Sequence, residues 1–269
     1  MKLLSWNIAS GGFKNYSYDL QTPERLPNII DVVKNSHADF VSLIDTFRWD
    51  TYFTTKELSK LFGYTHVFCI NLNDERLIQL GHNNGITVLT NLDNPLFSTI
   101  QIAGRNIIKT HFGNDMDIDI FSVYLDDLSE DTRLEQISAL EMEVTNPHRT
   151  IITGDLNTIA NEDVKKTKVL LKGFFDNFPQ LQEKLLPQIE DMMRGEVVEK
   201  IKGIGMKNAS DKFNPTIPTP LMFGKQEAFL RLDYLFLGEG IEASDFNVIK
   251  NNLSDIASDH YPIECNIRI

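Results

Sequence analysis

The string Gly154-Asp155-Leu156-Asn157 follows directly on the β-branched, apolar run Thr150–Thr153. Such a run is typical of a buried strand, and the polar residues after it mark the end of that strand. Similar strings lie far away in the chain, Ser5-Trp6-Asn7-Ile8 near its start and Ser258-Asp259-His260-Tyr261-Pro262 near its end. Because neighbouring strands bring distant residues to one edge of a sheet, the three strings predict a polar cluster at such an edge.

The chemical composition of this predicted cluster favours a metal-assisted reaction. It contains Asn, Asp and His side chains and no cysteine. Hard divalent cations such as Mg²⁺ prefer oxygen ligands, and a bound cation of this kind assists the cleavage of phosphate esters. The sequence therefore indicates an enzyme first and a binding module second.

Size and charge exclude some classes of protein. The chain has 269 residues, of which 42% are hydrophobic and 24% charged, as is ordinary for a globular protein with a large core. No apolar run reaches the about 20 residues of a membrane span, so we expect no membrane insertion. The run Met1–Asn7 is expected to form a first strand rather than a secretion signal, because its apolar part ends after two leucines.

The net charge of −12 argues against a protein that coats nucleic acid with a basic surface. The segment 164–212 nevertheless holds ten Lys and Arg against seven Asp and Glu. This local excess is typical of a solvated helical region, and it would also suit a basic rim beside an anionic substrate. Both interpretations stay open.

Two cysteines, Cys69 and Cys265, lie inside apolar runs. We expect buried free thiols, with a disulfide as the less favoured alternative. This cysteine usage favours a cytoplasmic location.

Strand-like runs recur along the whole chain, and helical patterns separate some of them. The expected strands are Leu3–Ile8, Phe40–Ile44, His66–Leu72, Ile86–Leu89, Ser98–Ala103, Ile107–His111, Ile118–Tyr124, Thr150–Thr153, Leu230–Leu237, Phe246–Ile249 and Ile263–Ile269. The expected helices are Pro23–Ser36, Lys56–Leu61 and Glu130–Val144. This order predicts an α/β fold of two packed mixed sheets flanked by helices.

We expect one domain over residues 1–269. The segment from about 163 to 206 is expected to be a helical excursion, because its leucines recur at helical spacing and it shows no strand signal. The following segment, Asn208–Pro220, is expected to be a polar, proline-rich loop.

Asp45 and Tyr124 close two of the expected strands. A carboxylate at a strand end is usually solvated, but Asp45 could also supply the main ligand of a hard cation. A tyrosine at such a place is usually structural, but Tyr124 could also donate a hydrogen bond to a phosphoryl oxygen.

Asp155 and Asn157 stand two residues apart, so in extended chain both side chains point to the same side. An ordinary turn would explain the two residues equally well. As a functional pair they would orient or deprotonate a water molecule and hold the phosphate opposite it.

Asp233 lies within an apolar strand, where a charge is unfavourable unless it is paired. Its natural partner is a histidine whose tautomer it would set, and Asp259-His260 supplies one. A single histidine is more often structural. Within this cluster, however, His260 is a candidate general acid or base, or a stabiliser of the transition state.

Four strings in this order resemble the endonuclease/exonuclease/phosphatase superfamily, which has the deoxyribonuclease I-like fold. They are Ser-Trp-Asn at 5–7, Gly-Asp-Leu-Asn at 154–157, Arg-Leu-Asp-Tyr at 231–234 and Ser-Asp-His-Tyr-Pro-Ile at 258–263. The resemblance covers nearly the whole chain. It implies a four-layer sandwich and cleavage of phosphoester bonds with Mg²⁺ or Mn²⁺.

The resemblance also implies roles for the residues that match these motifs. Asn7 and Asp45 would hold the metal ion, and Asp259 would lie close to it. Asp155 would orient or activate the attacking water, and Asn157 would contact the scissile phosphate.

His260, paired with Asp233, would stabilise the pentacovalent transition state, and Tyr124 falls where relatives carry His or Tyr.

Two features depart from the family pattern. Asp45 stands where relatives have Glu, which withdraws the carboxylate by about 1 Å from a cation that tolerates poor geometry badly. Asp126 and Asp127 place carboxylates where they would repel a phosphate. The alternative hypothesis is therefore a catalytically weakened pseudoenzyme that binds phosphate or a protein.

The sequence does not decide between a nucleic acid and a small organic phosphate as the phosphoester substrate, because this fold hosts many activities. The strings typical of inositol polyphosphate phosphatases, an aromatic-Arg pair after Asp-x-Asn and Trp-Cys-Asp-Arg, do not occur. We infer no obligate protein partner.

Overall fold

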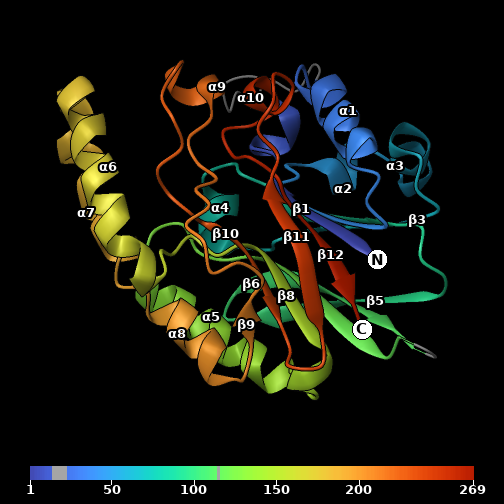
Figure 1. Ribbon diagram of the computed structural model, residues 1–269. Helices are drawn as coiled ribbons and strands as arrows, with labels where there is room; N and C mark the ends of the chain where they lie inside the picture. Colours follow the sequence, from blue (N-terminus) through green and yellow to red (C-terminus); the bar gives the residue numbers. More distant parts are fainter. Residues whose placement is uncertain (14–22, 114–115) are drawn as a thin grey trace.

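The computed structural model describes residues 1–13, 23–113 and 116–269. Within these residues two six-stranded sheets pack face to face, and helices cover their outer faces (Figure 1). This is the predicted four-layer arrangement of two mixed sheets between helices. No helix of the described residues has both the length and the apolar character needed to cross a membrane.

The first sheet has the order β11-β12-β1-β2-β4-β3. Its strands β1 and β2 run parallel, and every other neighbouring pair is antiparallel. The bounds are β1 Lys2–Asn7, β2 Phe40–Ile44, β3 His66–Asn71, β4 Gly85–Thr90, β11 Glu242–Val248 and β12 Ile263–Arg268.

The second sheet has the order β5-β6-β7-β8-β10-β9 and again contains one parallel pair, β7 and β8. The bounds are β5 Pro95–Ile102, β6 Arg105–Phe112, β7 Ile118–Tyr124, β8 Thr150–Asp155, β9 Lys207–Asn208 and β10 Asp233–Leu237. Each expected strand therefore forms, with ends that differ by at most a few residues. The two-residue strand β9 was not predicted.

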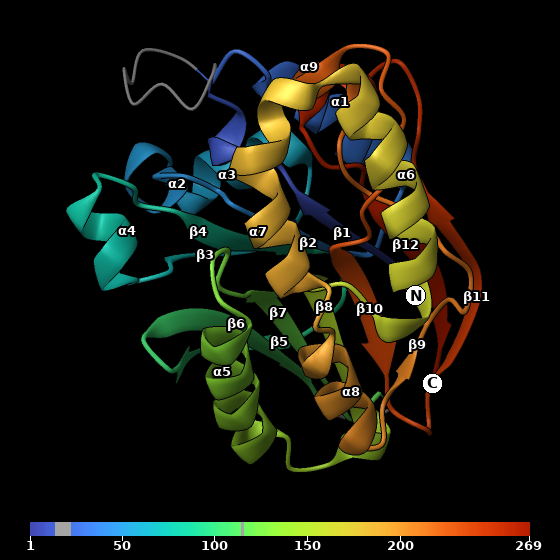
Figure 2. The same cartoon turned by 90° about the vertical axis from the view of Figure 1, so that its left-hand side faces the viewer.

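The helices are α1 Leu26–Ser36, α2 Trp49–Tyr52, α3 Thr55–Phe62, α4 Glu75–Gln79, α5 Glu130–Glu143, α6 Val164–Asn177, α7 Gln182–Met192, α8 Glu196–Gly203, α9 Pro220–Phe223 and α10 Ser254–Ala257. The helix expected from Pro23 begins only at Leu26. The helical excursion consists of α6, α7 and α8, with α6 and α7 side by side at one flank of the sheets (Figure 2). Four helices of four or five residues were not predicted, because they are too short to show an amphipathic period. They are α2, α4, α9 and α10.

Three apolar clusters hold the layers together. The largest lies between the two sheets and includes Leu3, Phe40 and Ile151. A second joins α1 and α3 to the first sheet, and a third joins α5 and α8 to the second. Cys69 and Cys265 are free thiols, as expected, and burial raises the pKa of Cys69 to about 12 and that of Cys265 to about 11.

Gly154 allows the closest approach of β8 to β7. Its φ of 142° lies where side chains are strained, and a Cβ atom there would lie 1.9 Å from the carbonyl oxygen of Val123. Both strands end at polar residues of the predicted cluster, so this contact sets the spacing of the cluster.

Gly154→Ala is expected to lower the free energy of unfolding by about 3 kcal/mol or more, because backbone must move to admit the methyl group. Urea denaturation followed by circular dichroism measures the change. The matched control is Gly173→Ala in α6, where no atom lies within 4 Å of the added Cβ. That exposed helical substitution should raise stability by about 0.5–1 kcal/mol. Equal effects of the two substitutions would contradict the prediction.

Candidate active site

Three strands of the second sheet place functional side chains in one row. Asp155 at the end of β8 pairs with Tyr124 at the end of the parallel strand β7. On its other side Asp155 pairs with Asp233, the first residue of the antiparallel strand β10. The register alone therefore brings together residues that are up to 109 positions apart in the chain.

The first sheet supplies the other side chains at the corresponding edge. Asn7 ends β1, and Asp45 follows directly on the end of the parallel strand β2. His260 precedes β12, whose first residue pairs with Ser5 of β1. The predicted site residues thus come from strand ends of both sheets.

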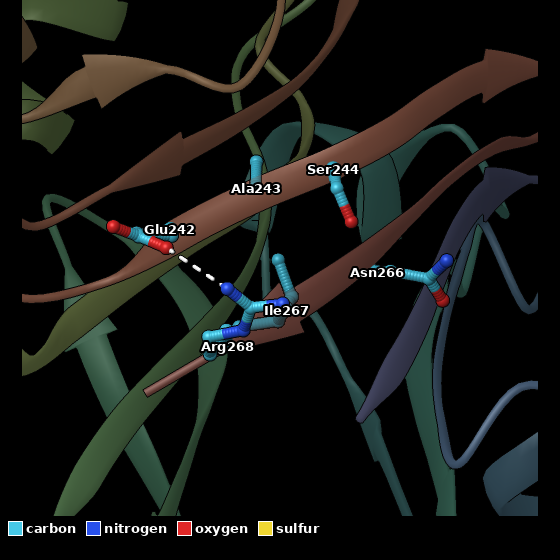
Figure 3. A pocket seen from close by; sticks show the side chains of 6 residues that line it. All are labelled: Glu242, Ala243, Ser244, Asn266, Ile267 and Arg268. Carbon is cyan, nitrogen blue, oxygen red and sulfur yellow. Dashed lines mark ion pairs between the residues drawn. The ribbon is translucent and has the colours of Figure 1, made fainter.

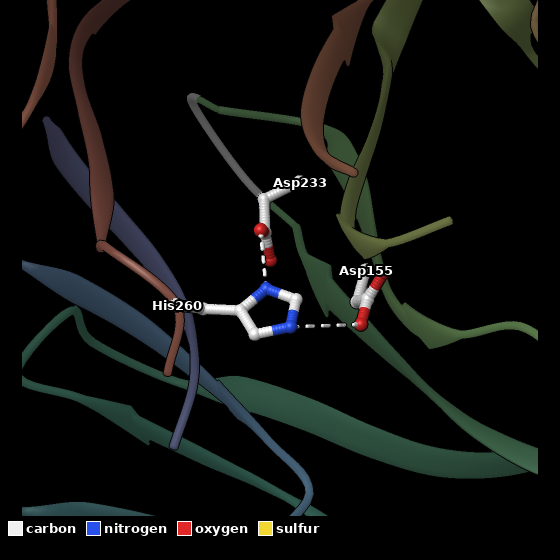
Figure 4. A group of neighbouring side chains, drawn as sticks. All are labelled: Asp155, Asp233 and His260. Carbon is white, nitrogen blue, oxygen red and sulfur yellow. Dashed lines mark hydrogen bonds and ion pairs between the residues drawn. The ribbon is translucent and has the colours of Figure 1, made fainter. Parts of the chain in front are cut away.

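His260 and Asp233 form the predicted pair (Figure 4). The ring atom Nδ1 of His260 lies 2.8 Å from Oδ2 of Asp233, and Nε2 lies 3.9 Å from Oδ2 of Asp155. All three side chains are buried. Burial alone would lower the pKa of His260, but Asp233, Asp155 and Asp259 raise it to about 10. This favours a protonated ring, which donates a hydrogen bond to Asp233 and directs its second N–H towards Asp155.

Asp155 is held by two donors. Nδ2 of Asn7 donates to Oδ2 over 2.9 Å, and the backbone N–H of Asn157 donates to Oδ1 over 2.9 Å. Burial raises the pKa of Asp155 to about 7, although the neighbouring His260 lowers it. A carboxylate with this pKa is a stronger base near neutral pH than an exposed aspartate.

Asn157 lies next to Asp155 in a left-handed backbone conformation, with a φ of 50°. Its Nδ2 donates to the carbonyl oxygen of Leu125 over 3.0 Å, so the side chain bridges the loops after β8 and β7. Contact of Asn157 with a phosphate stays a prediction.

Tyr124 stacks against a guanidinium group. The Cζ atom of Arg105 lies 5.3 Å from the centre of the ring. Burial and the nearby Asp45 and Asp155 hold the pKa of Tyr124 well above its usual value. The phenol is therefore protonated and able to donate a hydrogen bond.

Asp45 is fixed by donors from two neighbouring loops. Its Oδ2 accepts the backbone N–H of Ser10 over 2.7 Å, and its Oδ1 accepts a hydrogen bond from Nδ2 of Asn84. Burial, together with the nearby charge of Asp259, raises the pKa of Asp45 to about 7. Two buried carboxylates that repel each other form a site that a divalent cation would stabilise.

The donor set at this position fits a hard cation. Asp45 and Asp259 offer carboxylate oxygens. Among the described residues, Oδ1 of Asn7 accepts one hydrogen bond, from the N–H of Ala9, which leaves a second lone pair. Asp155, Asp233 and His260 also lie within ligand distance of one another. In this second group, Nδ1 of His260 is already engaged with Oδ2 of Asp233 over 2.8 Å.

Comparison with protein families identifies the fold. The endonuclease/exonuclease/phosphatase family model matches residues 4–260. The chain belongs to the endonuclease/exonuclease/phosphatase family. Comparison with curated proteins gives no significant match.

Solved structures of this family share the fold at low sequence identity. A 3′ phosphatase from Neisseria, bound to a product DNA hairpin, has a TM-score of 0.66 and 13% identity, with all of both chains covered. A mannosyl-6-phosphatase from Bacteroides thetaiotaomicron has a TM-score of 0.65 and 12% identity, also over both full chains. A family protein from Beutenbergia cavernae has a TM-score of 0.68 and 16% identity over all of this chain and 71% of its own.

Asp126 and Asp127, which depart from the family pattern, pair with two arginines. Arg105 and Arg76 each place an Nη2 atom 3.4 Å from Oδ2 of Asp126. Arg76 also pairs directly with Asp127, and Arg105 is anchored by Asp74 over 2.8 Å. The repulsion expected between these carboxylates and a phosphate is therefore offset. The arginines were missed, because nothing in the sequence links β6 and α4 to this loop.

A buried ion pair in α5 connects the loops that follow β7 and β8. Nε of Arg133 donates to Glu130 over 2.8 Å, and both side chains are fully buried. Arg133 also donates to the carbonyl oxygen of Asp126 over 2.9 Å, and Glu130 accepts from the hydroxyl of Thr158 over 3.0 Å. Sequence patterns could not reveal this pair, because opposite charges three residues apart are typical of exposed helix faces.

One surface hollow lies away from the site. It is lined by β11 and β12, where Glu242 and Arg268 pair over 3.6 Å (Figure 3). Arg268 ends the strand that His260 precedes, so this hollow lies at the opposite end of the sheet.

Asp45→Asn is expected to raise the stability of the metal-free protein at pH 8 by about 1 kcal/mol or more. A carboxyl whose pKa is raised on folding destabilises the fold when it is ionised, and the substitution removes that charge. The new amide can also pair with Asn84, whose Oδ1 has no partner among the described residues.

The same variant should lose the stabilisation that Mg²⁺ or Mn²⁺ gives to the unchanged protein. Thermal unfolding with EDTA or with each cation measures both effects. Equal stabilisation of both proteins by the cation would show that Asp45 is not a ligand.

Proposed function

We propose that this protein is a divalent-metal-dependent phosphoesterase, which hydrolyses a phosphodiester or phosphomonoester by in-line attack of water. The observation that carries the proposal is the hydrogen-bonded series Asp233–His260, with the second ring N–H directed at Asp155. The similarity to a 3′ phosphatase and to a mannosyl-6-phosphatase supports the same class of reaction.

We assign to Asp155 the role of orienting and deprotonating the attacking water. Asn7 and the backbone of Asn157 hold its carboxylate in one orientation. With a pKa of about 7, this carboxylate can accept a proton from water near neutral pH. The attack then starts from a fixed base, which removes the entropic penalty of orienting the water.

We assign to His260 the stabilisation of the negative charge that develops on the phosphoryl oxygens. Asp233 favours a proton on Nδ1, and the surrounding carboxylates raise the pKa of the ring to about 10, which favours a second proton on Nε2. A buried cation next to the reacting group stabilises a more negative transition state. Asn157 and Tyr124 would add neutral donors to the same phosphate.

Asp45, Asn7 and Asp259 are the residues that would hold Mg²⁺ or Mn²⁺. When bound, the cation supplies Lewis acidity that polarises a phosphoryl oxygen. The fixed position of Asp45, with donors from Ser10 and Asn84, would compensate for its short side chain.

The proposed substrate is a nucleic acid or a small organic phosphate. Residues 163–206 are the proposed specificity element, because α6 and α7 follow the Asp155–Asn157 loop and stand beside the sheets (Figure 2). We further propose that residues 1–269 form one domain, and that the protein acts in the cytoplasm, as its free thiols suggest.

His260→Gln is expected to lower the kcat for a generic phosphodiester or phosphomonoester by at least about a hundredfold, because the cationic donor is lost. Hydrolysis is measured with Mg²⁺, Mn²⁺ or EDTA. His148→Gln is the control, since His148 is 66% exposed and pairs only weakly with Glu239 at 3.4 Å. Equal rates for the two variants would contradict the assignment, and rates unaffected by EDTA would contradict the metal dependence.

Asp45→Glu separates the active enzyme from the pseudoenzyme alternative. In an active enzyme the longer side chain disturbs the contacts with Ser10 and Asn84 and should not raise kcat. A gain of about tenfold or more in metal-dependent turnover would show that the native site is compromised. A nuclease would in addition bind DNA or RNA in a salt-sensitive manner, which a small substrate does not require.

A further inference from the structure

The proline-rich loop predicted at 208–220 contacts Asp233 and the backbone on both sides of His260. Its residue Thr216 accepts the backbone N–H of Tyr261 on its carbonyl oxygen over 2.7 Å. Three residues later, the N–H of Thr219 donates to the carbonyl oxygen of Asp259 over 3.0 Å. Residues 216–219 therefore lie against the backbone on both sides of His260.

The side chain of Thr216 reaches Asp233 itself. Its Oγ1 lies 2.6 Å from Oδ2 of Asp233, the same oxygen that is 2.8 Å from Nδ1 of His260. Thr216 is fully buried. Since an ionised carboxylate is only an acceptor, the hydroxyl must be the donor. The hydroxyl oxygen in turn accepts the N–H of Leu232 over 3.4 Å.

We propose that Thr216 is a positioning residue of the active site, which orients Asp233 so that His260 is held with its second N–H towards Asp155. The inference rests on the proposed function and assigns a third member to its hydrogen-bonded relay, Thr216–Asp233–His260.

The unequal satisfaction of the two oxygens of Asp233 supports this role. Oδ2 receives two hydrogen bonds, whereas the buried Oδ1 has no partner among the described residues. With nothing to hold Oδ1, the plane of the carboxylate is set by the two donors to Oδ2. Removal of the hydroxyl leaves His260 as the single side-chain donor, and the carboxylate can then rotate to share both oxygens with the ring.

The backbone contacts of the loop explain why this hydroxyl is well placed. The N–H of Thr216 donates to the carbonyl oxygen of Leu230 over 2.8 Å, next to the strand that carries Asp233. Its carbonyl oxygen binds the segment that carries His260. Thr216 thus links the segment that carries Asp233 to the segment that carries His260, and these two segments belong to different sheets.

The test compares Thr216→Val, which keeps the shape and removes the hydroxyl, with Thr216→Ser, which keeps the hydroxyl. Thr150→Val is the matched control, because Thr150 is equally buried, donates to the carbonyl oxygen of Asn146 over 2.8 Å and lies at the far end of β8. The ring nitrogens of His260 are followed by ¹⁵N NMR of histidine-labelled protein, with His260→Gln for assignment.

Turnover is measured on bis(p-nitrophenyl) phosphate and p-nitrophenyl phosphate with Mn²⁺. Thr216→Val should shift the Nδ1 resonance of His260 and lower kcat about tenfold, with KM changed by less than about twofold. Thr216→Ser should restore both readouts, and Thr150→Val should change neither.

The proposal is overturned if Thr216→Val leaves the Nδ1 resonance where Thr150→Val leaves it, or if the resonance shifts while kcat stays unchanged. Absence of turnover in the unchanged protein would instead contradict the proposed function. The NMR comparison would then still decide whether Thr216 orients the His–Asp pair.

Discussion

The hydrogen bond between Asp233 and His260 joins the two sheets at the edge where the polar residues gather. Asp233 begins β10 of the second sheet, and His260 precedes β12 of the first. The bond holds the imidazole between carboxylates from the second sheet, which raise the pKa of the ring. The remaining contacts support it: Asn7 orients Asp155, and the backbone around Thr216 holds the chain on either side of His260.

The edge concentrates buried negative charge, and the fold manages this charge in different ways. His260 lies between Asp155 and Asp233 (Figure 4). Arg76 and Arg105 pair with Asp126 and Asp127. Burial and the nearby Asp259 raise the pKa of Asp45 to about 7, so its ionised form destabilises the fold. At Asp45 the proposed binding of a cation and the stability of the metal-free protein are therefore opposed.

The strands and the polar residues at their ends could be predicted from the sequence, because apolar runs and the residues that end them are local signals. The pairing of Asp233 with His260 could also be predicted, since a charge inside an apolar strand requires a partner. Thr216, Arg105 and the Glu130–Arg133 pair could not. Their roles depend on which loops pack together, and a buried arginine has the same local pattern as an exposed one.

The register of β7, β8 and β10 also has a consequence for how the protein folds. Two hydrogen bonds of the candidate site join residues far apart in the chain, Asp233 with His260 over 27 positions and Asn7 with Asp155 over 148. Contacts of such long range form late in folding, after local helices and hairpins. We therefore expect the cluster of charges to assemble only when both sheets have closed on each other.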